Sequence, residues 1–257
     1  MKGEVRSGDG VLIRFEVEGE GPPLVFVHGW SCDRSYFAGQ VPAFSDRHRV
    51  VCIDLAGHGE SGSERQEWTI PAFGEDVVSV SRELGLRRPV LVGHSMGGDV
   101  IVEAALRLGD DLAGLVWLDV YAELGEPPSS ESVEAFVEPF RHDFVSSTRS
   151  LVRRFFPEDA DPELVEFVVS DMSAAPPPIA VDALRHSISN PGAILRALPL
   201  LSAPLVAINP GYRPTDVEGL AEHGVRTVVM PDVGHFLMME EPGRFNDLLA
   251  QVVAEMA

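Results

Sequence analysis

Short apolar segments alternate with longer amphipathic segments along most of the chain. The apolar segments are rich in Val, Leu and Ile and are bounded by turn-forming residues, a pattern typical of strands that are buried on both faces of a sheet. This alternation predicts an α/β protein with a mostly parallel sheet covered by helices. The predicted strands are residues 11–17, 24–28, 50–54, 90–94, 114–119, 204–209 and 226–231, and the predicted helices are residues 70–84, 96–108 and 242–254.

One predicted strand has a different pattern. Apolar and polar side chains alternate along residues 11–17, whereas several of the other predicted strands are almost continuously apolar. Alternation indicates a strand with one face buried and the other in contact with solvent. We therefore expect residues 11–17 to form an antiparallel strand at the edge of the sheet.

Residues 121–200 do not follow the alternation of strands and helices. They contain no good strand signal, only helical patches separated by Pro and Ser clusters. We expect a helical lid over a pocket, attached to a core formed by residues 1–120 and 201–257. Most aromatic rings of this region are expected to pack it onto the sheet, with one or two facing a substrate. The phenylalanines concerned are Phe136, Phe140, Phe144, Phe155, Phe156 and Phe167.

The charge of the chain limits the classes of partner. Its 257 residues include 40 acidic and 20 basic residues, a formal net charge of −20. Such a surface repels the phosphates of nucleic acids and anionic membranes, so we expect neither as a partner. The charge favours a neutral or cationic small-molecule substrate, although an acidic surface that only keeps the protein hydrated has the same composition. The sequence does not indicate the oligomeric state.

The same composition indicates where the protein works. The first ten residues are polar, and no apolar run approaches the roughly 20 residues that cross a bilayer. Two cysteines, Cys32 and Cys52, fit a reducing compartment. We therefore expect a cytoplasmic protein. No Cys or His spacing resembles a metal site, and neither a metal nor another cofactor is expected.

The strongest chemical signal is the run Gly93-His94-Ser95-Met96-Gly97-Gly98. It directly follows a predicted strand and directly precedes a predicted helix. So sharp a turn strains the backbone of its middle residue, and glycines two residues before and two after Ser95 remove side chains that would clash there. The turn leaves the hydroxyl exposed at a helix N-terminus, which favours developing negative charge. We predict that Ser95 is a nucleophile; the alternative is a merely structural turn.

A serine hydroxyl is a weak nucleophile unless a base removes its proton. His235 has the best context for that base, because Gly234-His235-Phe236 lies between the last predicted strand and the C-terminal helix. Loops at the carboxyl ends of neighbouring strands face the same crevice. The other histidines have weaker contexts: His28 and His94 lie in motifs that use their backbone, His58 lies in a glycine turn, and His48, His142, His186 and His223 lie among charged or helical residues.

Four motifs in order resemble the α/β-hydrolase superfamily, over nearly the whole chain. They are the run His28-Gly29-Trp30, the glycine-rich turn at residues 54–62, the elbow around Ser95 and the late Gly234-His235. The resemblance implies the α/β-hydrolase fold, with about eight mostly parallel strands and a helical cap. It also implies that the backbone N–H groups of Trp30 and Met96 form the oxyanion hole. The turn at residues 54–62 is expected to be structural, and the indole of Trp30 to lie at the pocket mouth.

The acid of the triad has two candidates. In the more common family arrangement it follows the strand at residues 204–209, but residues 209–214 contain no carboxylate, and the nearest, Asp216, resembles the first turn of a helix. Another branch of the superfamily takes its acid from the end of the preceding strand, and Asp119 stands there. We predict Asp119 and keep Asp216 as the alternative. The acid should accept a hydrogen bond from the second nitrogen of the histidine.

Family members that open epoxides or break carbon–halogen bonds resemble this chain but carry Asp at the elbow, so Ser95 favours acyl transfer instead. Hydrolysis of carboxylesters is the expected activity, followed by cleavage of related acyl bonds. Perhydrolysis, carbon–carbon bond hydrolysis and cofactor-free dioxygenation remain alternatives, because enzymes of these kinds have a similar oxyanion loop or acid position. A non-enzymatic receptor that retains the triad is a further alternative, since fold alone does not decide function.

Overall fold

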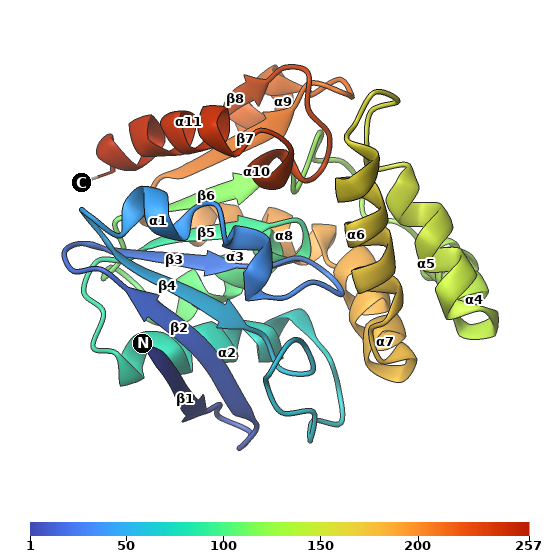
Figure 1. Cartoon of the computed structure of the whole chain (residues 1–257), viewed down its shortest axis with the longest axis horizontal. Coiled ribbons are helices and arrows are strands. Elements are labelled where there is room, and N and C mark those ends of the chain that lie inside the picture. Colours follow the sequence, from blue (N-terminus) through green and yellow to red (C-terminus); the bar gives the residue numbers. More distant parts are fainter. Residues whose placement is uncertain (257) are drawn as a thin grey trace.

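Eight strands form one sheet in the computed structural model, which describes residues 1–256. Their order across the sheet is β1-β2-β4-β3-β5-β6-β7-β8 (Figure 1). Strand β2 is antiparallel to its neighbours β1 and β4, and every pair from β4 to β8 is parallel. This confirms the expected eight-stranded, mostly parallel sheet. The strands are β1 Lys2–Arg6, β2 Leu12–Glu18, β3 Pro23–Val27, β4 Arg49–Asp54, β5 Val90–His94, β6 Gly114–Leu118, β7 Leu205–Pro210 and β8 Val225–Met230.

The prediction for residues 11–17 is right about direction and wrong about position. Strand β2 is antiparallel, but it lies between β4 and β1, and β1 forms the edge. The first residues look like a polar terminus because Lys2, Glu4 and Arg6 are exposed on this edge strand. Charged side chains are a common way to protect a sheet edge from pairing with other chains.

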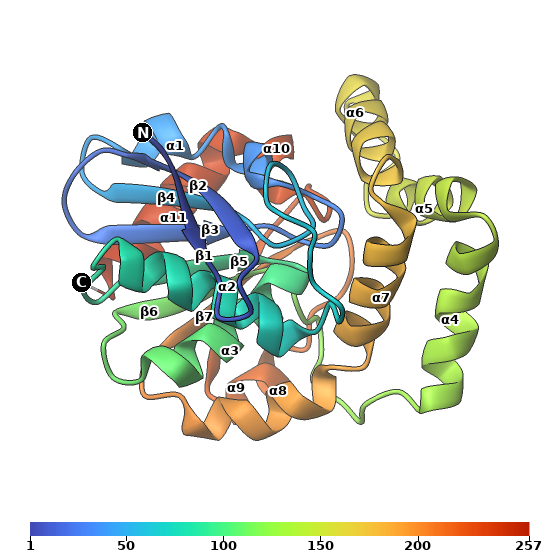
Figure 2. The ribbon, with the colours of Figure 1, turned by 90° about the horizontal axis from the view of Figure 1, so that it is seen from below.

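Helices cover both faces of the sheet (Figure 2). Helices α2 Ile70–Glu83, α3 Met96–Leu108 and α8 Pro191–Ala197 lie on one face, and α1 Val41–Phe44 and α11 Pro242–Ala254 lie on the other. The sequence shows why α2 begins where it does: the Thr69 side chain accepts a hydrogen bond from the Ala72 N–H, and a proline stands in the first turn. The short elements η1 Arg34–Phe37, α9 Val217–Glu222, η2 Leu198–Leu200 and α10 Leu237–Glu240 complete this layer structure.

Four helices stand beyond the carboxyl edge of the parallel strands (Figure 1). They are α4 Ser130–His142, α5 Phe144–Arg153, α6 Pro162–Ser173 and α7 Pro177–Ile188. Helix α8 belongs to the predicted lid range 121–200, but it packs against α3 of the core. In residues 1–256 no single helix is long and apolar enough to cross a membrane. Helices α6 and α7 meet that test only as a pair, bent by 103°.

The topology brings the predicted site residues to one edge. Strand β5 lies between β3, which precedes it in the chain, and β6, which follows it, so the direction of winding reverses beside β5. Ligands of open α/β sheets bind outside the carboxyl ends of strands at such a switch point. Trp30, Ser95, Asp119 and His235 all lie in the segments that leave the carboxyl ends of β3, β5, β6 and β8.

A buried carboxylate on α3 makes stability depend on pH. Asp99 is 3% exposed and accepts a hydrogen bond of 2.9 Å from the Tyr121 hydroxyl, and burial raises the pKa of Asp99 to about 7. The unfolded chain releases this proton near pH 4, so stability should fall as pH rises from about 4 to about 7. The variant Asp99→Asn is expected to melt about 3 °C or more above the wild type at pH 8, with a difference that shrinks toward pH 4.

Differential scanning fluorimetry across this pH range measures the effect. The variant Asp110→Asn is a suitable control, because Asp110 is exposed near the end of the same helix. An Asp99→Asn variant with the same difference in melting temperature at pH 4.5 and pH 8 would contradict the linkage.

Candidate active site

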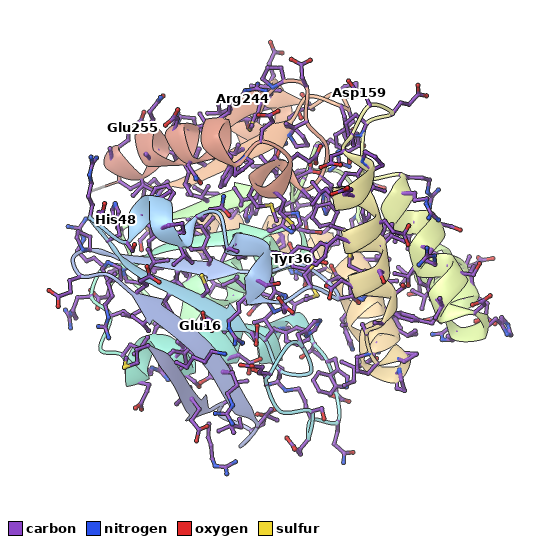
Figure 3. The ribbon with its side chains drawn as sticks, viewed as in Figure 1. Glu16, Tyr36, His48, Asp159, Arg244 and Glu255 are labelled. Atoms are coloured by element: carbon purple, nitrogen blue, oxygen red, sulfur yellow. The ribbon has the colours of Figure 1, made fainter. Side chains whose placement is uncertain are left out.

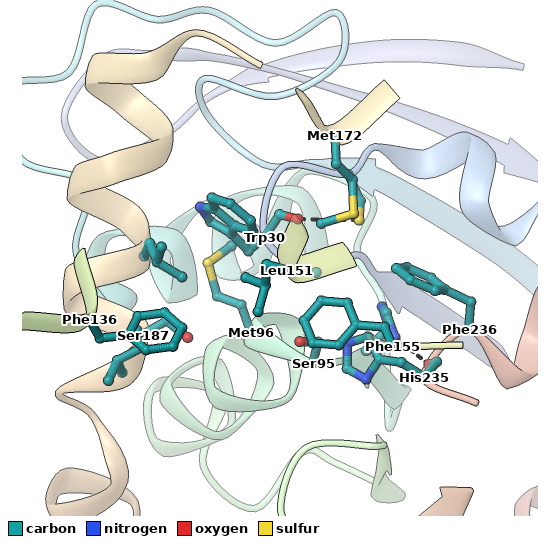
Figure 4. A pocket seen from close by; sticks show the side chains of 15 residues that line it. Trp30, Ser95, Met96, Phe136, Leu151, Phe155, Met172, Ser187, His235 and Phe236 are labelled. Atoms are coloured by element: carbon teal, nitrogen blue, oxygen red, sulfur yellow. Dashed lines mark hydrogen bonds between the residues drawn. The ribbon is translucent and has the colours of Figure 1, made fainter. Parts of the chain in front are cut away.

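Ser95 forms the turn between β5 and α3. Its φ angle of 52° lies in the left-handed region, which a residue with a side chain rarely adopts. The flanking glycines make the turn possible: a Cβ at Gly93 would overlap the carbonyl oxygen of Gly97, and one at Gly97 would overlap the carbonyl oxygen of Val27. The Ser95 N–H donates to the Leu118 carbonyl at 3.0 Å and ties the turn to β6. The side chain of Ser95 therefore faces a cavity above the sheet (Figure 4).

The backbone N–H groups of Trp30 and Met96, near Ser95, have no acceptor within the described residues. Met96 is the first residue of α3, where a helical N–H has no partner within its helix. The loop that carries Trp30 approaches the serine closely, since a Cβ at Gly29 would lie 3.2 Å from the Ser95 Cβ. Both predicted donors are thus free to bind an oxyanion.

The ring of His235 lies beside Ser95 in the same cavity (Figure 4). Its Nδ1 donates to Asp119 Oδ2 at 2.6 Å, and both side chains are buried, at 8% and 1% exposure. This bond leaves Nε2 as the nitrogen that can accept a proton. The Ser95 hydroxyl makes no hydrogen bond to the ring in residues 1–256; catalytic contacts are often longer without substrate.

The structure brings Asp119, and not Asp216, to the histidine. Asp216 is exposed and its carboxylate accepts from the Gly219 N–H at 3.0 Å, as the cap of α9. Asp119 also accepts from Arg213 Nη2 at 2.6 Å through its other oxygen. Burial raises the pKa of Asp119, but His235 and Arg213 outweigh burial and hold that pKa below its usual range. The carboxylate therefore stays ionised beside the imidazole.

The peptide backbone around His235 is held by groups that the sequence analysis did not single out. The N–H of His235 donates to the Phe155 carbonyl at 2.8 Å, and its carbonyl lies 2.9 Å from His94 Nε2. Glu240 accepts from the N–H groups of the two neighbours, Gly234 at 2.8 Å and Phe236 at 3.1 Å. The side chain of His94 therefore has a structural role in addition to any role of its backbone. The same holds for His28, whose Nε2 accepts from the Leu55 N–H.

The cavity above Ser95 has a volume of about 330 Å³ and a mostly apolar wall (Figure 4). Two of the six phenylalanines in the predicted lid region line it, Phe136 and Phe155, as expected. The Phe155 ring packs on the His235 ring with centroids 4.6 Å apart. Other apolar side chains of the wall are Trp30, Met96, Leu151, Met172, Leu184, Ile188 and Phe236.

The four helices beyond the sheet are fastened to the core near the cavity. The Trp30 indole lines the cavity, is 5% exposed and donates through Nε1 to the Ala180 carbonyl of α7 at 2.7 Å. The ring is buried because it packs edge-on against Phe140 and Phe144. The Tyr36 hydroxyl donates to Asp171 of α6 at 2.8 Å, between core and insertion (Figure 3).

Other polar groups near the strand ends have structural partners. The turn at residues 54–62 is held by Asp54, whose carboxylate accepts from the N–H groups of Arg34 and Glu60 and pairs with the Arg34 guanidinium. This agrees with the structural role expected of the turn. No group of three or more His, Cys, Asp or Glu side chains in residues 1–256 is arranged to hold a metal ion.

Comparison with known proteins places this geometry in a family. The alpha/beta hydrolase family matches residues 24–248. A pimeloyl-[acyl-carrier protein] methyl ester esterase from Methylococcus capsulatus is 32% identical over 72% of this chain and 74% of that protein. The structure of a thermophilic esterase from Thermogutta terrifontis has a TM-score of 0.85 and 27% identity, and the match covers 100% of this chain and 99% of that chain.

A third match is partial. The dihydrolipoyllysine-residue acetyltransferase component of the acetoin cleaving system from Pseudomonas putida is 36% identical over 138 residues. This match covers 53% of the present chain and 36% of that longer protein. The family match, in contrast, includes strands β4 to β8, most of β3, the serine turn and the late histidine loop. The chain therefore belongs to the alpha/beta hydrolase family.

Proposed function

We propose that this chain is a serine esterase for a small, uncharged substrate. The observation that carries the proposal is the position of the His235 ring, which lies beside Ser95 in one apolar cavity and donates to Asp119 Oδ2 at 2.6 Å. A nucleophile, a base and a carboxylate that orients the base are the three parts that acyl transfer to serine requires.

In the proposed reaction, Ser95 Oγ attacks the ester carbonyl carbon while His235 Nε2 takes the hydroxyl proton. The resulting oxyanion accepts hydrogen bonds from the N–H groups of Trp30 and Met96, each of which is expected to lower the barrier by about 3–4 kcal/mol. His235 returns its proton to the leaving alcohol, and the acyl group remains on Ser95. Water, deprotonated by His235, then attacks the acyl carbon and releases the acid and free Ser95. Asp119 steadies the imidazolium in both halves.

The cavity indicates the class of ester. At about 330 Å³ it is near the lower limit of small-molecule sites, and helices α4 to α7 would act as the lid that closes it. No lysine, arginine, aspartate or glutamate lines it in the described part of the chain. A charged substrate would therefore lose its hydration without gaining a partner. Similarity to two esterases, one of them a methyl ester esterase, supports the same reaction class.

A series of p-nitrophenyl esters from acetate to decanoate tests the proposal. We expect kcat/KM to be highest for acyl chains of about two to six carbons and to fall at least tenfold for the longest chains, because these exceed the cavity. A matched pair of a neutral butyrate ester and an anionic hemisuccinate ester should favour the neutral one by about tenfold or more.

The same assay separates the proposal from its alternatives. Release of p-nitrophenol at the rate of the Ser95→Ala variant across the whole series would contradict an esterase. Ligand-induced thermal stabilisation without turnover would then favour a receptor, and oxygen consumption with a heteroaromatic substrate would favour a dioxygenase.

A further inference from the structure

The carboxylate of Asp119 has two partners of different kinds. Oδ2 accepts from the His235 ring, and Oδ1 accepts from Arg213 Nη2, each at 2.6 Å. The side chain of Asp119 is 1% exposed, so water cannot replace a missing partner. A buried carboxylate without a cation or several donors is unfavourable. The Arg213 guanidinium is therefore the second partner that stabilises the buried carboxylate of Asp119, in addition to His235.

Arg213 lies close to Asp119 because the two residues follow neighbouring strands of the sheet. It follows β7, the strand that pairs with β6, and Asp119 follows β6. The two strand ends are joined directly, because the Asp119 N–H donates to the Ile208 carbonyl at 3.1 Å. The segment after β7 contains no carboxylate before Asp216, so the strand end next to the acid presents a cation instead.

The ion pair holds the acid in one orientation. Asp119 has a φ angle of 46°, in the left-handed region, so its main chain alone does not favour this placement. With Oδ1 fixed by Arg213, rotation of the carboxylate is restricted and Oδ2 stays directed at His235 Nδ1. The guanidinium is itself positioned over the Tyr212 ring, 5.7 Å from its centroid.

We propose that Arg213 is a positioning residue that locks the triad acid and, through its charge, limits how strongly that acid favours the protonated imidazole. This inference rests on the proposed function of the site. A bare carboxylate attracts an imidazolium more strongly than a carboxylate paired with a cation does. Arg213 thus weakens the attraction between the carboxylate and a positive charge on the imidazole, while it preserves the geometry of the base. His94 and Glu240 also lie close to the imidazole, and a substitution at Arg213 leaves both unchanged.

The variants Arg213→Gln and Arg213→Lys test the proposal without a known substrate. The measurement is the pH dependence of Ser95 labelling by a fluorophosphonate, which needs the serine and its base but no ester. At low pH the labelling rate rises with pH (the acid limb), and at higher pH it reaches a constant plateau. For Arg213→Gln we expect the acid limb to shift to higher pH by about one unit, because the positive charge beside Asp119 is lost. We expect the plateau rate to fall about tenfold, because the hydrogen bond that orients Asp119 is lost as well. Arg213→Lys should restore the limb and only part of the plateau.

The control is Arg226→Gln. Arg226 is an exposed arginine on β8, separated from β6 by β7, and pairs with Glu255. The acid limb and the plateau rate of labelling in this variant should match those of the wild type. A limb that does not move in Arg213→Gln would overturn the electrostatic role, and an unchanged plateau would overturn the positioning role. These failures differ from failure of the proposed function. A wild type that labels at Ser95 but cleaves no ester contradicts the esterase and leaves the Arg213 test intact, whereas a wild type that does not label overturns both.

Discussion

Replacing Ser95 by alanine is expected to lower kcat for the best p-nitrophenyl ester by at least about 10⁴-fold, because the proposed reaction forms its acyl intermediate on the Ser95 hydroxyl. The fold should be unaffected. Alanine has the same Cβ as serine at the left-handed turn, and the Ser95 hydroxyl makes no hydrogen bond within the described residues. Circular dichroism and the melting temperature should therefore match the wild type, while p-nitrophenol release falls to background.

Ser187→Ala is the matched control, because Ser187 lines the same cavity from α7. Its kcat should stay within about threefold of the wild type. Intact-protein mass spectrometry after treatment with a fluorophosphonate should show one adduct, mapped to Ser95 and lost in Ser95→Ala. An adduct on another residue, or a Ser95→Ala variant that keeps a tenth of its activity, would refute the assignment.

Asp119→Asn is expected to lower kcat by about 10⁴-fold. The amide oxygen of the substituted side chain can still accept from Arg213, which turns the amide NH₂ toward the His235 ring. Nδ1 must then accept that hydrogen bond, so the ring proton moves to Nε2, the nitrogen that has to take the proton of Ser95. The loss therefore arises from the wrong tautomer in a correctly folded site.

Asp216→Asn provides the comparison that decides between the two candidate acids. Asn is as good a helix cap as Asp, so α9 should remain intact and kcat should stay within about twofold of the wild type. Steady-state kinetics of both variants on one ester measures the contrast. Similar losses in the two variants would argue against Asp119 as the acid.

Periodicity predicted most of the sheet and the three long helices of the core, because buried parallel strands and amphipathic helices have clear patterns. Residues 90–94, 96–108 and 242–254 appear with the predicted bounds as β5, α3 and α11. Strand β1 was missed because its exposed residues are charged, and its two inward positions are Gly3 and Val5. That pattern is too short to distinguish an edge strand from a polar terminus.

The site residues that lie within one local sequence motif could be predicted. The contacts between segments that are distant in the sequence could not. The elbow around Ser95 dictates its own turn, and the N-cap pattern at Asp216 correctly indicated a helix start. Arg213, in contrast, is 94 residues from Asp119 in the chain, and Glu240 acts through backbone groups of a loop. Nothing in their local sequence shows which strand ends lie side by side. The only available signal was the absence of a carboxylate directly after β7. It indicated that the acid lies elsewhere, which favoured Asp119, but it did not indicate that Arg213 pairs with that acid.

The helical insertion does more than line the cavity, because its Phe155 carbonyl also holds the main chain of His235. This second role affects how the protein can be engineered. Exchanging insertions between relatives is an obvious way to change substrate preference, since α4 to α7 supply much of the cavity wall. In this protein such a transplant would also detach the main chain of His235 from its acceptor, because Phe155 lies between α5 and α6. A chimera whose new segment places no carbonyl there would leave the His235 N–H without this acceptor, however well its new walls fitted. Libraries that retain residues 154–157 and vary α4 and α7 should yield active variants far more often.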